Sequence, residues 1–267
     1  MKKHISLLFT AVLLTITTAW AQTPAQNAAL SLKETLRKLI SQHTSVGYDN
    51  LWTSYLSTDK TADGYVWDIY GLESYHYIYG SSKQGANYDS EGDSFNREHS
   101  VPQSWFGEIE PMKSDLFQVY PTDGYVNNKR ANYPYGEVGT ATYTSANGSK
   151  LGTCKSGIGY SGIVFEPIGT YKGDIARSFF YMATCYGNKI DSWSGDVFGQ
   201  SAMFDGVSGY PGIAPWALKM FIRWSEEDPV SQKEIDRNNA IYKIQGNRNP
   251  FIDCPGLERF IWSDYIK

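Results

Sequence analysis

The stretch that decides the fold is Asn96-Arg97-Glu98-His99-Ser100-Val101-Pro102-Gln103-Ser104-Trp105-Phe106. Its first four residues place two hydrogen-bonding groups, an acid and a base side by side. They follow residues 80–95, whose Gly, Ser, Asn and Asp content is typical of a loop. Because such a polar cluster is costly to bury without a purpose, we interpret it as the first half of a candidate site, with a simple polar turn as the alternative.

A second polar segment follows a short distance downstream. Residues 116–120 have the composition of a short strand, and residues 121–124 that of a turn or a helix start. A helix that begins there places Asp123, Asn127 and Arg130 on one face, because residues three or four positions apart are neighbours on a helix. Asn127 then offers a neutral oxygen ligand. Arg130 offers a cation that either clamps a phosphate or pairs with Asp123.

The two segments together contain the groups that metal-assisted hydrolysis needs. Mg²⁺ prefers oxygen ligands and keeps several water ligands, so the protein needs to supply only a few. The Glu98 carboxylate and the Asn127 amide oxygen are suitable protein ligands. His99, with an ordinary pKa of about 6.5, can take a proton from water near neutral pH. A zinc site is disfavoured, because no His-Glu-x-x-His pair occurs in the sequence.

These residues resemble a known family. Residues 96–106 are similar to the Asn-Arg-Glu-His-x-x-Pro-x-Ser-Trp signature of the endonuclease I family, and residues 115–130 to its second motif. Shorter likenesses at 165–167, 172–177 and 245–253 extend the resemblance from about Trp67 to Trp262. The resemblance implies an α+β fold, with a ββα-metal nuclease core embedded in a mainly helical single domain. It also implies cleavage of DNA, and often of RNA, with little sequence preference.

The resemblance also implies roles for individual residues. Glu98 and Asn127 would bind the metal, which we expect to be Mg²⁺ with Mn²⁺ or Ca²⁺ as alternatives, and His99 would be the general base. Two departures stand out: Phe117-Gln118 replaces the His-Asn of many relatives, and no Arg lies between His99 and Lys129. The groups expected to position the phosphate backbone are therefore Asn96, Arg97, Lys113, Arg130 and Arg177, with an Asp174–Arg177 helix pair as the alternative for the last.

The N-terminal residues predict export. Residues 1–21 combine a basic start, an apolar run and the small-residue site Ala19-Trp20-Ala21, which is typical of a cleaved signal peptide. A retained interfacial anchor is the alternative. The expected mature chain is one nuclease domain over residues 22–267, secreted or periplasmic, without stable membrane association and monomeric.

The charge of the mature chain bears on its partners. Loss of Lys2 and Lys3 leaves 22 basic and 28 acidic side chains, a formal charge of −6. Because this field repels polyanions, a nucleic-acid enzyme must gather cations locally or use a metal. The acidic charge and Phe117-Gln118 favour one competing hypothesis, a catalytically impaired secreted binding protein on the same scaffold. A carbohydrate-active enzyme lacks a recognisable carboxylate pair.

The remaining patterns predict the scaffold. Ser31 and Glu34 form a capping box for a first helix over 31–43, residues 65–79 predict a strand or extended structure, and residues 136–162 predict a loop. Helices are expected at 173–186, 215–226 and 230–244, with a short piece after Pro255. Cys154, Cys185 and Cys254 allow either one disulfide or buried thiols. His43 and His76 are expected to be structural.

Overall fold

Two antiparallel strands and the helix after them carry both sequence motifs. Strand β1 (Phe95–His99) pairs with β2 (Val119–Asp123), and α3 (Gly124–Arg130) follows β2 directly. The register pairs Glu98 with Tyr120. Helix α3 begins at Gly124 because the Asp123 carboxylate accepts a hydrogen bond from the Val126 N–H and caps the first turn. The strand predicted at 116–120 is wrong in position, since the chain turns at 116–118 and extends only from Val119.

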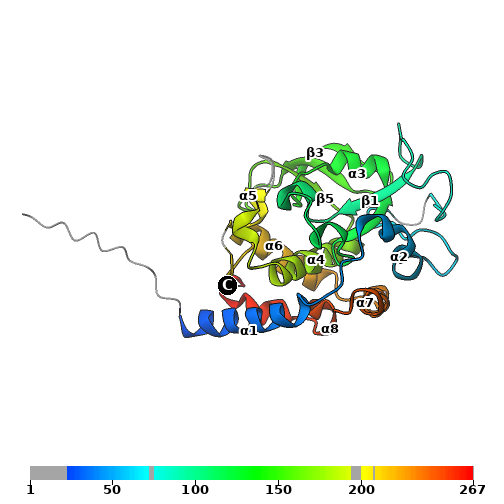
Figure 1. Cartoon of the computed structure of the whole chain (residues 1–267). Coiled ribbons are helices and arrows are strands. Elements are labelled where there is room, and N and C mark those ends of the chain that lie inside the picture. Colours follow the sequence, from blue (N-terminus) through cyan, green and yellow to red (C-terminus); the bar gives the residue numbers. More distant parts are fainter. Residues whose placement is uncertain (1–22, 72–74, 194–199, 207, 267) are drawn as a thin grey trace, which may run out of the picture.

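The structure is a computed structural model that describes residues 23–71, 75–193, 200–206 and 208–266. The predicted signal peptide at 1–21 lies outside these residues. Within them, helices and small antiparallel sheets form a mixed α+β fold (Figure 1). None of the helices in these ranges combines the length and the apolar character that crossing a bilayer would need.

A second sheet contains three strands in the order β3 (Val138–Thr144), β4 (Lys150–Cys154) and β5 (Ile163–Glu166). The loop predicted at 136–162 is therefore wrong. Strand β3 escaped prediction because most of its residues are exposed, so it lacks the alternation of a half-buried strand. The turn between β3 and β4 contains Gly148, whose φ of +96° suits glycine.

The helical half is built around α4 (Lys172–Cys185), whose residues from Gly173 onward are all buried. Helices α1 (Pro24–Ile40), α6 (Pro215–Glu227) and α8 (Pro250–Asp253) pack against it (Figure 1). The helices predicted at 173–186, 215–226, 230–244 and after Pro255 are confirmed. The remaining helices of the described chain are α2 (Leu51–Thr58), α5 (Gln200–Met203), α7 (Gln232–Gln245) and α9 (Leu257–Ile261).

Helix α1 begins earlier than the sequence predicted. Its N-cap is Thr23, which accepts a hydrogen bond from the Gln26 N–H while the Gln26 side chain accepts from the Thr23 N–H. Pro24 occupies the first helical position, where its missing N–H costs nothing. The capping box proposed at Ser31 and Glu34 is therefore wrong, because these residues lie inside the helix.

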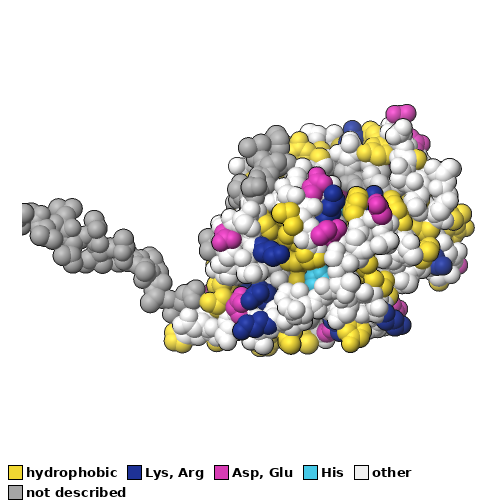
Figure 2. Space-filling view, viewed as in Figure 1, with side chains coloured by type: hydrophobic (Ala, Val, Ile, Leu, Met, Phe, Trp, Pro, Cys, Tyr) yellow, Lys and Arg dark blue, Asp and Glu magenta, His cyan; other side chains and the backbone are white. Residues whose placement is uncertain are grey.

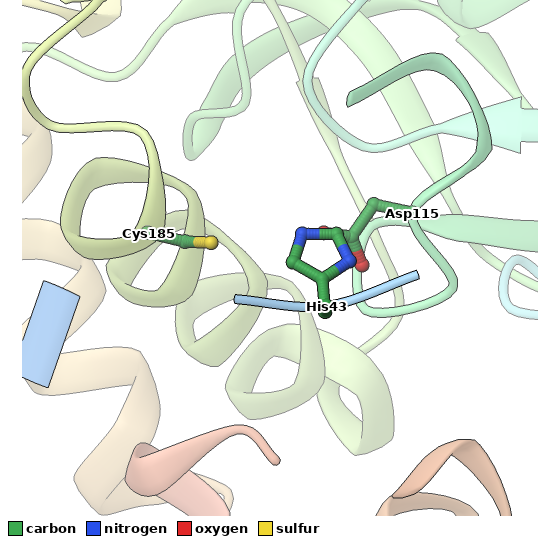
Figure 3. Close-up of side chains that lie close together, drawn as sticks. All are labelled: His43, Asp115 and Cys185. Atoms are coloured by element: carbon green, nitrogen blue, oxygen red, sulfur yellow. The ribbon is translucent and has the colours of Figure 1, made fainter. Parts of the chain in front are cut away.

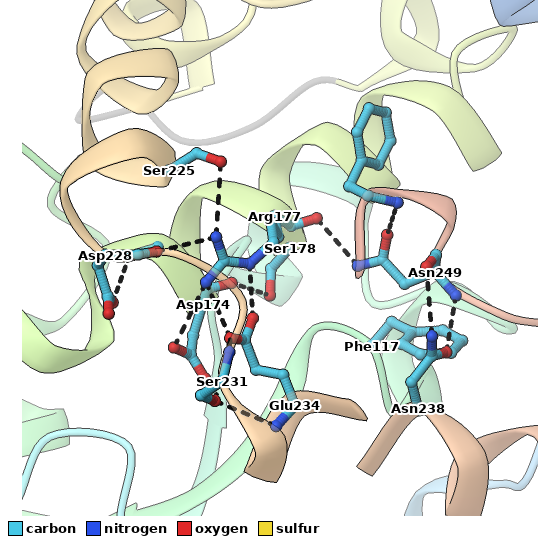
Figure 4. Close-up of polar contacts among 12 residues, drawn as sticks. Phe117, Asp174, Arg177, Ser178, Ser225, Asp228, Ser231, Glu234, Asn238 and Asn249 are labelled. Carbon is cyan, nitrogen blue, oxygen red and sulfur yellow. Dashed lines mark hydrogen bonds and ion pairs between the residues drawn. The ribbon is translucent and has the colours of Figure 1, made fainter. Parts of the chain in front are cut away.

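A buried polar network joins α4 to α6 and α7 (Figure 4). The Arg177 guanidinium is 1% exposed and donates to both carboxylate oxygens of Glu234, at 2.5 and 2.9 Å, and to the Asp228 carbonyl. Its contact with Asp174 is longer, at 3.9 Å. The sequence had offered Arg177 as a phosphate-binding residue, but the structure encloses it in the core with its charge already paired.

Replacing Arg177 tests this structural role. Arg177→Ala leaves the Glu234 carboxylate buried and uncompensated, so we expect the free energy of unfolding to fall by about 3–5 kcal/mol. The matched control is Arg223→Ala, which breaks a pair whose arginine side chain is 46% exposed and should cost under about 1 kcal/mol. Urea unfolding followed by circular dichroism measures both. Equal midpoints for the two variants would contradict the assignment.

Candidate active site

A cavity of about 150 Å³ lies where β1 meets α3. It receives side chains from both sequence motifs and from the turn after α3. One space is thus bordered by Glu98, His99 and Asn127, although Asn127 follows Glu98 by nearly thirty positions in the sequence. The residues that line it are Arg97, Glu98, His99, Pro102, Gln103, Asn127, Arg130, Ala131 and Asn132.

The Glu98 carboxylate is held through only one of its oxygens. Oε1 accepts from the Tyr70 hydroxyl at 2.5 Å, from Arg130 Nη1 at 2.7 Å and from the Tyr135 hydroxyl at 3.3 Å. Oε2 receives no hydrogen bond from the described residues. Burial raises the pKa of Glu98, and the Arg130 guanidinium opposes that rise. The residue is therefore fixed in place while one oxygen stays available at the cavity.

Tyr70 and Tyr135 are site residues that sequence reasoning missed. Both rings pack on Phe165 of β5, with centroid separations of 4.8 and 6.2 Å, and their hydroxyls lie 2.6 Å apart. Strand β5 therefore aims two hydroxyls at Glu98. The aromatic density of residues 65–79 was a visible signal for Tyr70, whereas nothing local marked Tyr135.

Asn127 is oriented by its amide nitrogen. Nδ2 donates to Asn96 Oδ1 at 2.7 Å and to the Arg97 carbonyl at 3.3 Å. This arrangement leaves the Asn127 side-chain oxygen without a donor among the described residues. Asn96 thus positions Asn127 and is not itself part of the cavity lining.

The hydrogen bonds of His99 define its tautomer. Nε2 lies 2.9 Å from the Lys113 carbonyl, which can only accept, so Nε2 carries a proton. Burial lowers the pKa of His99 to about 4, which keeps the ring neutral and leaves a lone pair on Nδ1. The Tyr48 ring stacks on the imidazole at 5.7 Å between centroids. The ring is therefore held as a base whose free nitrogen is Nδ1.

Arg130 differs from its expected role. Its side chain is 1% exposed and donates to Glu98 Oε1, the His99 carbonyl and the Ser100 carbonyl, at 2.7 to 2.8 Å. The expected pairing with Asp123 is wrong, because the Asp123 carboxylate accepts from Tyr77 and from backbone N–H groups. Both terminal nitrogens are therefore engaged, and through them Arg130 holds the end of β1.

Arg97 and Lys113 are the more accessible cations near the cavity. Arg97 lines it and donates to the Tyr48 carbonyl through Nη1 at 2.9 Å, and its other side-chain N–H groups make no hydrogen bond to a described residue. Lys113 binds Glu108 at 2.8 Å and contributes its carbonyl to His99. Arg97 is therefore the cation best placed for a phosphate at the cavity.

The departure at Phe117-Gln118 lies outside the cavity lining. The Gln118 side chain donates to the Met112 carbonyl and accepts from the Val101 N–H, so it braces the segment after β1. Phe117 is buried against Tyr181. The substitution therefore alters supporting structure without removing a group from the cavity.

A second cluster has metal-ligand chemistry but a different bonding pattern. His43, Asp115 and Cys185 bring one donor atom each within 4.8 Å of one another (Figure 3). Asp115 Oδ1 already accepts from the Phe117 N–H and the Gln245 amide, and Oδ2 from the Tyr181 and Tyr186 hydroxyls. Burial also raises the pKa of the Cys185 thiol. With both carboxylate oxygens saturated, the cluster is a hydrogen-bonded core network, and His43 is structural.

Cysteine pairing and surface charge complete the description. Cys154, Cys185 and Cys254 are all free thiols, and Cys254 is exposed, so the disulfide alternative is not realised. On the face shown in Figure 2, basic and acidic side chains lie interspersed instead of forming one broad basic area. A nucleic acid that approaches this face would therefore meet no broad basic area.

The chain belongs to a nuclease family. Residues 28–256 match the model of the endonuclease I family, so the membership that the sequence predicted is confirmed. It is 32% identical over 249 residues to the extracellular ribonuclease of Bacillus subtilis, covering 87% of this chain and 74% of that protein. The extracellular ribonuclease of Bacillus amyloliquefaciens is 34% identical with the same coverage. An extracellular deoxyribonuclease of Aeromonas hydrophila is 29% identical over 55% of this chain and 52% of its own. A secreted or periplasmic location is confirmed by these comparisons.

The network around Asp115 predicts a stability effect that does not depend on metal. Asp115→Ala leaves two buried tyrosine hydroxyls without their acceptor, and each should cost about 1–3 kcal/mol. The control, Glu226→Ala, breaks an ion pair whose side chains are 51% and 43% exposed. Thermal unfolding with and without chelator measures both. If chelator destabilised the parental protein and Asp115→Ala abolished that chelator effect, the cluster would be a metal site.

Proposed function

We propose that this protein is a secreted, magnesium-dependent endonuclease that hydrolyses phosphodiester bonds of DNA and RNA with little sequence preference. The observation that carries the proposal is the unequal bonding of the two Glu98 carboxylate oxygens. Three donors hold Oε1, while Oε2 is available in a cavity shared with Asn127 and a neutral His99. We assign β1, β2 and α3 to a ββα-metal core on this basis.

The side-chain oxygens of Glu98 and Asn127 are of the chemical type that a magnesium ion prefers. Each offers a hard oxygen that the described residues leave free, and the cavity has room for water ligands. When bound, the ion would supply Lewis-acid stabilisation to the negative charge that develops on the phosphate and the leaving oxygen. The saturated oxygens of Asp115 make the His43 cluster a poorer candidate.

His99 supplies the proton acceptor. Nδ1 takes a proton from water while the water oxygen forms a bond to phosphorus and the bond from phosphorus to the 3′-oxygen breaks. The Lys113 carbonyl accepts a hydrogen bond from Nε2–H, so Nδ1 is the ring nitrogen that can accept the proton. The leaving 3′-oxygen takes a proton from solvent water, and His99 returns its proton to solvent, so the products are a 5′-phosphate and a 3′-hydroxyl.

Arg97 is proposed to bind the phosphate through N–H groups that Tyr48 does not use. Arg130 and Asn96 position Glu98 and Asn127. Contacts of this kind read the backbone and not the base edges, so cleavage should tolerate sequence. The matched relatives are named both ribonuclease and deoxyribonuclease, which supports activity on both polymers.

Removing the base tests the mechanism. His99→Ala should lower kcat/KM for plasmid relaxation by about 10²- to 10⁴-fold, because a general base contributes that much. The matched control is His76→Asn, an exposed histidine that contacts Tyr65 and has a positive φ that asparagine tolerates. Circular dichroism checks that both variants fold. A folded His99→Ala protein that cuts at the parental rate would remove the mechanism.

The ligands are tested by magnesium titration. Glu98→Gln and Asn127→Ala should each raise the Mg²⁺ concentration for half-maximal cleavage by about tenfold or more, because each weakens one of the two protein ligands. Asn128→Ala, an exposed neighbour on α3, is the control and should leave the titration unchanged. Superimposable titration curves for all the proteins would refute the ligand assignment.

A further inference from the structure

A row of stacked side chains leads away from His99. The Tyr48 ring lies over the His99 ring, with planes 26° apart. The Arg97 guanidinium carbon is 3.5 Å from the Tyr48 centroid and 4.7 Å from the Trp52 centroid. His99, Tyr48, Arg97 and Trp52 therefore form a continuous stacked row from the proposed base to the start of α2.

The row ends at a second cavity, of about 240 Å³. Trp52 forms one wall, and Leu56, Tyr79 and Gln84 form others. The Tyr79 hydroxyl is anchored on the Asp59 carbonyl, and Gln84 Oε1 accepts from the Gly80 N–H. The Gln84 amide nitrogen therefore remains a donor that no described residue uses. Among the described residues, none that lines this cavity is charged.

We propose that this cavity binds an unpaired nucleobase of the substrate strand close to the scissile phosphodiester, and that the protein therefore prefers single-stranded nucleic acid. The inference rests on the proposed nuclease function. Trp52 joins the two cavities, because it borders this one and contacts Arg97, which borders the other. A strand whose phosphate is bound at Arg97 therefore has Trp52 within reach.

The chemistry of the cavity favours a base over other occupants. Aromatic walls bind any base through its flat face, which agrees with tolerance of sequence. The absence of charged lining disfavours a phosphate. By contrast, Lys60, Lys233 and Arg237 line another cavity, together with Asp236. A base that remains paired and stacked in a duplex cannot enter a cavity of this kind without flipping, which costs free energy.

The first test places a charge in the cavity without touching Arg97. Leu56, which is 48% exposed, becomes Glu, and the control is Leu39→Glu on α1, where the leucine is 69% exposed and outside the cavity. The mature protein, with Mg²⁺, is assayed on a fluorescent single strand and on a hairpin duplex of the same sequence. We expect Leu56→Glu to lower kcat/KM about tenfold on the single strand only, a loss of about 1.4 kcal/mol. Leu39→Glu should change neither substrate.

The second test uses Trp52 and an abasic substrate. Trp52→Ala should lower the single-strand to duplex rate ratio about tenfold, and Trp52→Phe should largely restore it, since stacking needs only a ring. Trp216→Ala, which removes a tryptophan bordering a different cavity, is the control. In a strand with one cleavable linkage, removing the base at one nearby position should slow the parental protein but not Trp52→Ala.

The outcomes separate the two levels of the argument. A parental protein that cuts neither substrate overturns the nuclease function and this inference together. Suppose instead that the parental protein cuts both substrates. If the Leu56→Glu and Trp52→Ala variants then lose activity equally on the two substrates, or lose none, the base-binding cavity alone is overturned. Loss confined to the single strand, with an abasic effect that depends on Trp52, supports it.

Discussion

The ion pair between Arg130 and Glu98 is the contact on which the rest of the site depends. Burying either charge alone would be prohibitive, so the guanidinium must find acceptors, and it takes Glu98 Oε1 together with the carbonyls of His99 and Ser100. That choice ties the last turn of α3 to the end of β1. It also decides which carboxylate oxygen is used structurally and which is left, so one buried contact fixes both the backbone and the free carboxylate oxygen.

Other buried carboxylates show what a purely structural acid looks like. Asp59, Asp68, Asp115 and Asp123 each accept hydrogen bonds on both oxygens. Glu98 accepts on one. Glu258 also has an unpartnered oxygen, but that atom is buried and the residue lines none of the cavities described. An available oxygen matters only where it meets a space and a second ligand, and Glu98 satisfies both conditions.

The sequence predicted residues that border one cavity better than it predicted the scaffold around them. Asn96 to His99 and Asp115 to Arg130 are local motifs, so their residue types and spacing could be read directly. Helices with strong signals, such as α6 after Pro215, could also be predicted. Strand β3 could not, because its exposed threonines carry no hydrophobic alternation. Tyr70 and Tyr135 could not either, because their hydroxyls reach Glu98 only through packing on Phe165, a contact between distant segments.

The acidic net charge of the chain is compatible with the few cations that are free at the cavity. Of the four cations that the sequence offered for phosphate binding, Arg130 and Arg177 are buried in ion pairs and Lys113 is paired with Glu108, which leaves Arg97 at the cavity. A cavity that gives a polyanion so few free cations releases few counterions there, so we expect weak binding. Weak ground-state binding suits a catalyst that must release its products, because interactions reserved for the transition state raise the rate. The net charge that seemed to oppose a nuclease thus fits one that binds briefly and cuts.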